Sequence, residues 1–106
     1  MKVISTEKAP AAIGPYSQGI TAGDFFFASG QIAIIPETGE IAEATIEAQT
    51  EQVMKNIGNL LAAAGVDYSK VVKTSCFLAD MGDFGAFNEI YAKYFTSKPA
   101  RSCVAV

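Results

Sequence analysis

The sequence predicts one α+β domain over residues 1–106, in which a sheet is backed by two helices. Short apolar runs of strand length alternate along the chain with two segments whose apolar residues repeat at helical spacing. A chain of 106 residues, half of them hydrophobic (50%), has the size and core content of a single domain. No repeat, low-complexity tract or linker divides it.

Strands are expected first along the chain. After an extended N-terminal segment, residues 16–21 and 25–29 have the pattern of two strands, and residues 22–24 (Ala-Gly-Asp) form the hairpin loop between them. Residues 31–35 continue this region, and the turn-forming residues 36–39 close it. The first third of the domain is therefore predicted to be sheet.

A helical period begins at about Thr45 and continues to Ala64. The apolar side chains that recur on one side of this segment are Ile46, Val53, Ile57, Leu60, Leu61 and Ala64. The polar side chains that run at i+4 down the other side, which is predicted to face solvent, are Glu47, Glu51, Lys55 and Asn59. Gly65 stands where a left-handed C-cap is wanted, so the helix is expected to end there.

The rest of the chain predicts a strand, a second helix and a last strand. Residues 71–78 alternate as a strand, and Asp80 or Asp83 can cap a helix that continues to about Phe95. The side chains on the core stripe of this helix are Phe84, Phe87, Ile90, Tyr91 and Tyr94. An extended run over residues 100–106 follows.

Three consecutive phenylalanines, Phe25 to Phe27, break the alternation expected of a half-buried strand. Such a strand presents aromatic side chains on both faces, and both faces need to be covered. Because the two helices can cover only one face, the other predicts contact with a second copy of the chain and hence a homo-oligomer. A local patch beneath the N-terminal arm is the alternative.

The composition excludes several classes of site. The chain has no His, so it cannot build a Ser-His-Asp or Cys-His triad or a His-ligated zinc site, and its two cysteines alone cannot hold zinc. A net charge of -3 with scattered basic residues offers no surface for nucleic acid. No apolar run approaches the ~20 residues that span a bilayer, and no signal peptide is recognised. A cytoplasmic protein without membrane contact is expected.

Arg101 is the single arginine of the chain and stands at the start of the last predicted strand. Its planar, permanently charged guanidinium is suited to bind a carboxylate or a phosphate, and a surface or interface ion pair is the alternative. Cys103 has the same strand parity, so both side chains are expected on one face while Val104 and Val106 point into the core. The nearby cation favours Cys103 as the more reactive thiol, whereas Cys76 is expected to be a small buried hydrophobe.

Four further residues are candidates for a binding site. The stiff segment 13–18 presents Tyr16, which is either part of a pocket wall or ordinary packing. Ser29 and Gly30 place a hydroxyl group and a residue without Cβ at a strand end, where a ligand or another backbone can approach closely. Asn88 lies in the second helix and either finds hydrogen-bond partners in the interior or is exposed.

Three separated motifs carry a resemblance to a known family. They are Ala9–Gly19 (APAAIGPYSQG), Ser29–Ile32 (SGQI) and Pro99–Val104 (PARSCV), and together they strongly resemble the RidA (YjgF-like) family of enamine/imine deaminases. The resemblance covers essentially the whole chain, with the intervening helices in the same order. It implies a chorismate-mutase-like α+β fold, assembled as a homotrimer with three pockets at the subunit interfaces.

The resemblance also implies an activity, which is hydrolysis of reactive 2-imino or 2-enamino acids, such as 2-aminoacrylate, to 2-oxo acids and ammonia, with no metal and no cofactor. By match to the family motifs, Arg101 binds the substrate carboxylate, and Tyr16 and Cys103 are the other catalytic residues. Ser29, Gly30 and Asn88 join Arg101 in binding the substrate. The alternatives are a non-catalytic trimer that binds small carboxylates and regulates a partner enzyme, and a holdase or ribonuclease role. The acidic charge disfavours the nuclease.

One feature of the family has no counterpart in this sequence. Family members usually continue beyond the Arg-Ser-Cys-Val strand into a further strand, with a Glu that is thought to position or activate the attacking water. No residue of the 106 matches that Glu. The C-terminal strand is therefore expected to be missing from a partial chain, and a complete chain of this length is expected to have weak activity or none.

Overall fold

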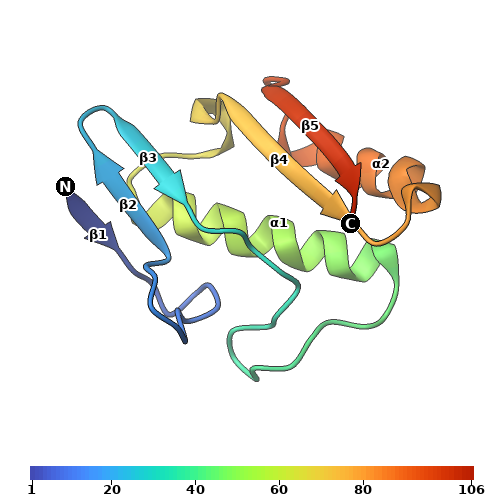
Figure 1. The fold of residues 1–106 in the computed structure, drawn as a ribbon, viewed down its shortest axis with the longest axis horizontal. Helices are drawn as coiled ribbons and strands as arrows, with labels where there is room; N and C mark the ends of the chain where they lie inside the picture. Colours follow the sequence, from blue (N-terminus) through green and yellow to red (C-terminus); the bar gives the residue numbers. More distant parts are fainter.

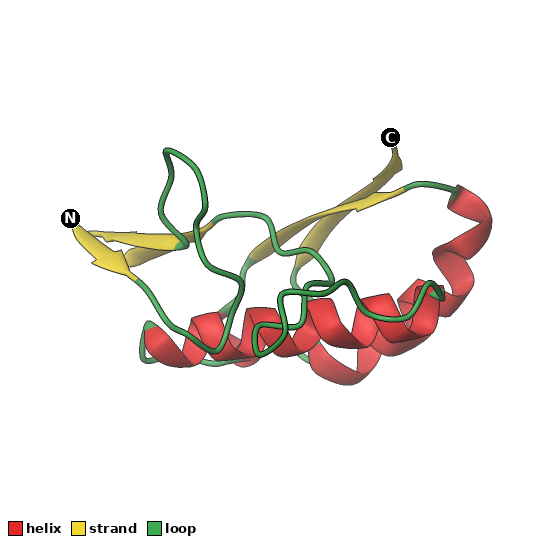
Figure 2. Cartoon of the chain, turned by 90° about the horizontal axis from the view of Figure 1, so that it is seen from below, coloured by secondary structure: helices red, strands yellow, loops and turns green.

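The computed structural model describes residues 1–106 as two layers, with the strands in one layer and both α-helices in the other. Figure 1 shows the order of the elements, and Figure 2 shows the strand layer lying over the helices. The elements are β1 (Lys2–Ile4), β2 (Gly19–Ala22), β3 (Phe25–Ala28), α1 (Ile46–Ala63), the 3-10 helix η1 (Tyr68–Lys70), β4 (Lys73–Leu78), the 3-10 helix η2 (Met81–Asp83), α2 (Phe84–Tyr94) and β5 (Ala100–Ala105). The predicted α+β architecture with two helices is confirmed.

The strand layer contains two separate hydrogen-bonded sheets. β1, β2 and β3 are antiparallel, whereas β4 and β5 pair in parallel with α2 as the crossover between them. β3 and β4 are not paired, although β4 lies between β3 and β5 in the layer (Figure 1). In the β2–β3 hairpin Ala22 pairs with Phe25, and the turn begins at Gly23, whose φ of 60° is the positive value that such a two-residue turn requires.

The N-terminal region departs from the prediction in three places. β1 was not predicted, because a strand of three residues is too short for an alternating pattern and is stabilised only by its pairing with β2. The strand predicted from residue 16 begins at Gly19, since the side chain of Gln18 holds the preceding segment as a loop. Residues 31–35 form one isolated β-bridge rather than a strand.

The bounds of α1 follow from local chemistry. Thr45 is the N-cap, and its Oγ1 accepts a hydrogen bond of 3.1 Å from the backbone N–H of Ala48. At the other end Gly65 adopts a φ of 81° and its N–H donates to the carbonyl oxygen of Ala62. Both signals are contained in a few neighbouring residues, so the predicted ends are correct to within one or two positions.

The main core cluster lies between the helices and the β4–β5 sheet. Its buried members are Met54, Leu78, Phe87, Ile90, Tyr91 and Phe95. The predicted buried side of α1 is correct at Leu60 and Leu61, but the fully buried Asn56 was missed. The predicted solvent-facing side is also wrong at Glu51 and Asn59, which are half-buried because Tyr94 of α2 and the backbone at Lys8 pack over them.

The face of the strand layer that points away from the helices is largely apolar. Phe25 and Phe27 are exposed on it by 63% and 62%, and Phe77 of β4 by 65%. Phe26 points the other way and lies over Gly19, where a Cβ would come within 2.3 Å of its ring. The expectation that this strand carries aromatic side chains on both faces is therefore confirmed.

The two faces of β5 are the reverse of those predicted. Val104 and Val106, which were expected to point into the core, are 47% and 82% exposed. Arg101 and Cys103 are the half-buried side chains, because α2 packs against the face that carries them. Alternation shows which residues share a face, but the choice of the face that meets a helix depends on the packing of that helix.

Candidate functional site

The side chain of Arg101 is held by three residues of α2. Its guanidinium carbon lies 5.2 Å from the centre of the Phe84 ring and 4.7 Å from that of Tyr91. Between these rings, Nη1 donates a hydrogen bond of 2.6 Å to Oδ1 of Asn88. The three partners follow one another at i, i+4 and i+7, so one stripe of the helix forms the whole support.

Tyr91 is in turn fixed from the strand side. Its hydroxyl group shares a hydrogen bond of 2.7 Å with Oγ1 of Thr74, and Thr74 is the register partner of Arg101 across β4 and β5. The Tyr91 side chain is buried with 7% of its surface exposed. Because ring, hydroxyl and strand register constrain one another, the guanidinium has a defined orientation before any ligand binds.

Arg101 forms no ion pair with an acidic side chain of its own chain. A guanidinium is charged at every relevant pH, and the hydrogen bond that it makes here goes to a neutral amide. Aromatic faces attract a cation without neutralising it. Within the chain Arg101 therefore forms no ion pair, and its guanidinium keeps N–H donors for an anion such as a carboxylate.

Cys103 lies beside Arg101 on the same face of β5 and packs against the core cluster. Its register partner across the sheet is Cys76, and both cysteines are free and half-buried. Burial is the main cause that raises the pKa of the Cys76 thiol above its usual value. The expectation that Cys76 is a small buried hydrophobe is correct only in part, since this side chain remains accessible.

Tyr16, Ser29 and Gly30 lie on loops at the ends of β2 and β3. Tyr16 is 52% exposed, so it is not ordinary core packing. Ser29 joins the two loops, because its N–H donates to the carbonyl oxygen of Gln18 and its Oγ donates to that of Ser17 at 2.6 Å. Gly30 is open, since a Cβ built there meets nothing within 4 Å.

Two buried amides that sequence reasoning missed hold these loops in place. The Gln18 side chain accepts from the N–H of Thr6 at 2.7 Å and donates to the carbonyl oxygens of Thr6, Ala9 and Pro10. Asn56 of α1 donates to the carbonyl oxygens of Ile32 and Ile34 at 3.0 and 2.9 Å, just beyond Gly30. Neither residue type signals burial, and only the location of Gln18 beside the Pro- and Gly-rich segment could have drawn attention to it.

Within one chain the predicted site residues fall into two groups. We call Arg101, Asn88 and Cys103 the C-terminal half, and Tyr16, Ser29 and Gly30 the N-terminal half. The hydrogen bonds and ring contacts of each group stay within that group and its own supports. The β2–β3 hairpin and β5 stand at opposite sides of the strand layer with β4 between them (Figure 1).

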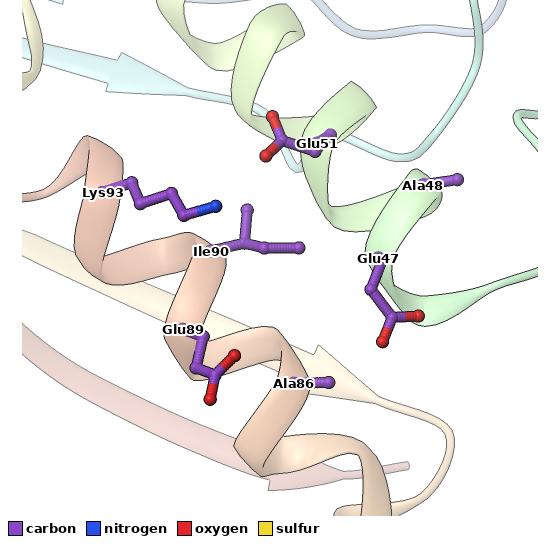
Figure 3. A pocket seen from close by; sticks show the side chains of 7 residues that line it. All are labelled: Glu47, Ala48, Glu51, Ala86, Glu89, Ile90 and Lys93. Carbon is purple, nitrogen blue, oxygen red and sulfur yellow. The ribbon is translucent and has the colours of Figure 1, made fainter.

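A groove lies between α1 and α2, and Figure 3 shows its lining. The lining residues are Glu47, Ala48, Glu51, Ala86, Glu89, Ile90 and Lys93. Three carboxylates and one ammonium group give it an acidic character, and it contains none of the predicted site residues. This groove is unsuited to an anionic ligand.

Two broader features of the chain bear on its chemistry. No three His, Cys, Asp or Glu side chains are gathered in an arrangement that could hold a metal ion. Neither α-helix combines the length and the apolar character of a membrane span. The groups that this chain itself places around Arg101 are aromatic rings, an amide, hydroxyl groups and thiols.

Comparison with known proteins relates nearly the whole chain to one family. The model of the endoribonuclease L-PSP family matches residues 6–106. The chain is 58% identical over 106 residues to the chloroplastic Reactive Intermediate Deaminase A of Arabidopsis thaliana, covering 99% of the chain and 57% of that protein. It is 54% identical to a RutC family protein of Pyrococcus horikoshii, covering 99% of the chain and 84% of that protein. It is 49% identical to the 2-iminobutanoate/2-iminopropanoate deaminase of mouse, covering 99% and 78%.

Solved structures agree with the sequence relatives. A putative endoribonuclease from Thermotoga maritima superimposes with a TM-score of 0.98 at 48% identity, over 100% of this chain and 84% of that one. The YjgF gene product of E. coli does so with a TM-score of 0.94 at 44% identity, over 100% and 86%. E. coli TdcF with bound serine has a TM-score of 0.94 at 40% identity, over 100% and 86%. The chain therefore belongs to the endoribonuclease L-PSP family, the family of the RidA and YjgF proteins.

Proposed function

We propose that this chain is a deaminase that hydrolyses 2-imino and 2-enamino acids, such as 2-aminoacrylate, with Arg101 as the receptor of the substrate carboxylate. The observation that carries the proposal is the orientation of the Arg101 guanidinium between two aromatic rings and a neutral amide. The names of the Arabidopsis and mouse relatives support a deaminase at the level of the family.

The proposed reaction consists of proton transfers and the addition of one water molecule. A 2-enamino acid first takes a proton at C3 and becomes the 2-imino acid. Water then adds to C2 of the protonated imine, and the C2–N bond of the resulting carbinolamine breaks. The products are ammonia and a 2-oxo acid, so the atoms of one water molecule are consumed for each turnover.

The chain's own groups can place these reactants. The carboxylate on the guanidinium fork of Arg101 fixes C2 at a defined distance, and such positioning makes a large contribution to rate. The Ser29 hydroxyl donates to the Ser17 carbonyl oxygen, so its lone pairs are left to accept an N–H of the substrate. Backbone groups near Gly30 and Cys103, together with the Tyr16 hydroxyl, would hold the nitrogen or the water.

The site would be completed between copies of the chain in a homotrimer. This part of the proposal is supported by the separation of the two halves within one chain and by the exposed apolar face that carries Phe25, Phe27 and Phe77. A head-to-tail ring brings the N-terminal half of one copy to the C-terminal half of the next. The two halves then meet without any rearrangement within a chain.

Release of 2-oxo acid and ammonia from freshly generated 2-aminoacrylate tests the activity, measured above the spontaneous rate. Arg101→Ala should abolish the acceleration with the fold and assembly intact. Arg101→Lys should retain part of it, because the charge remains and the two-pronged geometry is lost. Lys93→Ala removes a cation from the acidic groove and serves as the matched control, with an unchanged rate. Equal rates in the wild type and Arg101→Ala would refute the proposal.

A mixing experiment tests whether two copies share the site. Arg101→Ala and Tyr16→Ala chains, each inactive alone, are unfolded together in equal amounts and refolded. In a randomly mixed ring about a quarter of the pockets combine an intact N-terminal half with an intact C-terminal half, so about a quarter of the wild-type rate should return. No recovery in a mixture that assembles normally would place both halves of the site in one chain.

The second candidate function is a non-catalytic trimer that binds small carboxylates and regulates a partner. Two relatives favour it, namely the putative regulator AldR of Lactococcus lactis, 53% identical, and E. coli TdcF, which was solved with bound serine. The contacts of Arg101 also include no carboxylate that could act as a base. Calorimetry with a 2-oxo acid distinguishes the two candidates, because this function predicts saturable, Arg101-dependent binding without turnover.

A further inference from the structure

The two cysteines of the chain stand directly opposite each other on neighbouring parallel strands. Cys76 of β4 and Cys103 of β5 are register partners. Paired strands lie about 4.7–4.9 Å apart, which is within the Cα separations of about 4.4–6.8 Å that disulfides span. Directly opposite residues point to the same face, and both side chains pack against the same core cluster.

Both thiols can be reached by small reagents and neither has another bonding role. Both are free and half-buried, and the one hydrogen bond that involves either sulfur joins Sγ of Cys76 to Oγ1 of Thr74 at 4.0 Å. We propose that Cys76 and Cys103 form a reversible intramolecular disulfide under peroxide, next to Arg101. The chain would thus carry a redox-sensitive bond beside its anion receptor.

The chemistry balances with a peroxide as the oxidant. The Cys103 sulfur attacks one peroxide oxygen, the O–O bond breaks, and one water leaves after proton transfer, so that a sulfenic acid remains. The Cys76 sulfur then attacks the Cys103 sulfur, the S–O bond breaks and a second water leaves. The two thiols lose two electrons and two protons, and the peroxide is reduced to two waters.

The order in which the two sulfurs react follows from the groups around them. Burial raises the pKa of Cys76, which keeps it as a thiol and makes it the less reactive of the two sulfurs toward peroxide, so it enters at the second step. Cys103 lies two residues from the guanidinium on the same face of β5, which suits it to attack first. A disulfide between half-buried sulfurs is open to exchange with small thiols, so reduction restores the starting state.

The disulfide would also affect Arg101 through the strand pairing. Thr74 and Arg101 are the register pair two positions before Cys76 and Cys103, and Thr74 holds the hydroxyl of Tyr91. A covalent link that changes the spacing or twist of β4 and β5 at the cysteines therefore disturbs the support of the guanidinium. This consequence for turnover rests on the proposed function, whereas formation of the bond does not.

The experiment treats the folded wild-type protein with hydrogen peroxide, alkylates the remaining thiols after unfolding and records the intact mass. The expected product is a single chain that has lost two hydrogens, takes up no alkylating agent, and regains both thiols with dithiothreitol. Cys76→Ser should instead add oxygen at Cys103. The double variant Ser75→Cys/Cys76→Ser moves the thiol to the opposite face of β4 and should form no internal bond. Urea unfolding of the thiol form should show that this variant is as stable as the wild type.

Three results would overturn the proposal. They are two fully alkylated thiols after peroxide treatment, a product of two chains linked together, and an internal bond in Ser75→Cys/Cys76→Ser as readily as in the wild type. Turnover is measured separately on the fully oxidised protein, where a loss that dithiothreitol reverses is expected. Unchanged turnover would refute the effect on Arg101 while the mass result stands, and absence of turnover in the reduced protein would count against the proposed function alone.

Discussion

The Tyr91 ring supports Arg101 from one side, with 4.7 Å between the guanidinium carbon and the ring centre, while its hydroxyl group bonds to Thr74 of the neighbouring strand. Tyr91→Phe keeps the ring and removes the bond, so we expect a loss of about 1 kcal/mol in the free energy of unfolding and little change in KM. Tyr91→Leu removes the aromatic face as well, and we expect a clearly higher KM. Urea unfolding and steady-state kinetics on both variants check this, and equal KM values would contradict it.

Asn88 orients the guanidinium without competing for its charge. Asn88→Asp would place a carboxylate at the position that now lies 2.6 Å from Nη1, so we expect the fold to be kept and carboxylate binding to weaken about 10- to 100-fold. Asn88→Ala removes the contact without adding a charge and should weaken binding less. Calorimetric titration with a 2-oxo acid measures both, and an aspartate variant that binds as well as the alanine variant would rule out this role.

Gln18 satisfies four backbone groups of the N-terminal loop with one buried amide. Gln18→Leu has nearly the same volume but leaves those groups unpaired, so we expect a loss of about 2–3 kcal/mol in the free energy of unfolding. Gln31→Leu is the control, because that amide makes two bonds, of 3.1 and 3.4 Å, at a more exposed place. Chemical unfolding of the two variants should show the larger loss for Gln18.

We expect the free energy of unfolding to decrease at alkaline pH because of Tyr94. Its hydrogen bond to Glu51, together with burial, raises the pKa of Tyr94 from 10.0 to about 12. The unfolded chain therefore loses this proton before the folded chain does, and the stabilising effect is complete below pH 10 and is lost between pH 10 and about 12. The difference in unfolding free energy between the wild type and Tyr94→Phe should shrink over this interval. A difference that stays constant would contradict the assignment.

Gly58 of α1 is required by the packing of Tyr68. A Cβ on Gly58 would lie 2.3 Å from the Tyr68 hydroxyl oxygen, and this ring packs between those of Tyr94 and Phe95. Gly58→Ala should therefore cost about 1–3 kcal/mol, despite the better helix propensity of alanine. Gly85→Ala in α2, where a Cβ meets nothing within 4 Å, should instead stabilise the protein. Thermal unfolding compares the two, and the same sign of change in both would refute the steric explanation.

The parts of the fold that depend on neighbouring residues were predictable from the sequence. The helical period together with Thr45 and Gly65 located α1 almost to the residue, and Gly23 located the β2–β3 turn. These signals act over about one turn of chain, so they can be recognised without knowledge of distant contacts. The motifs around Tyr16, Ser29 and Arg101 likewise identified the family, since residue identity alone carries that information.

Contacts between distant segments decided the rest. Alternation along β5 placed Arg101 and Cys103 on one face of the strand. It could not show that α2 covers this face rather than the face with Val104. An amide side chain can form hydrogen bonds with water or with buried backbone groups. The burial of Gln18 and Asn56 therefore depends on backbone groups that lie far from them along the chain.

The sequence by itself determined the helices, the hairpin turn and the family, and it named the residues of the candidate site. Only the tertiary structure showed that Arg101 packs against Phe84 and Tyr91, and that the contacts of Ser29 lie in the N-terminal half. The physical reason is the range of the forces involved. Caps, turns and periodicity are local, whereas the side of a strand that is covered and the neighbours of a charge are set by packing across the whole domain.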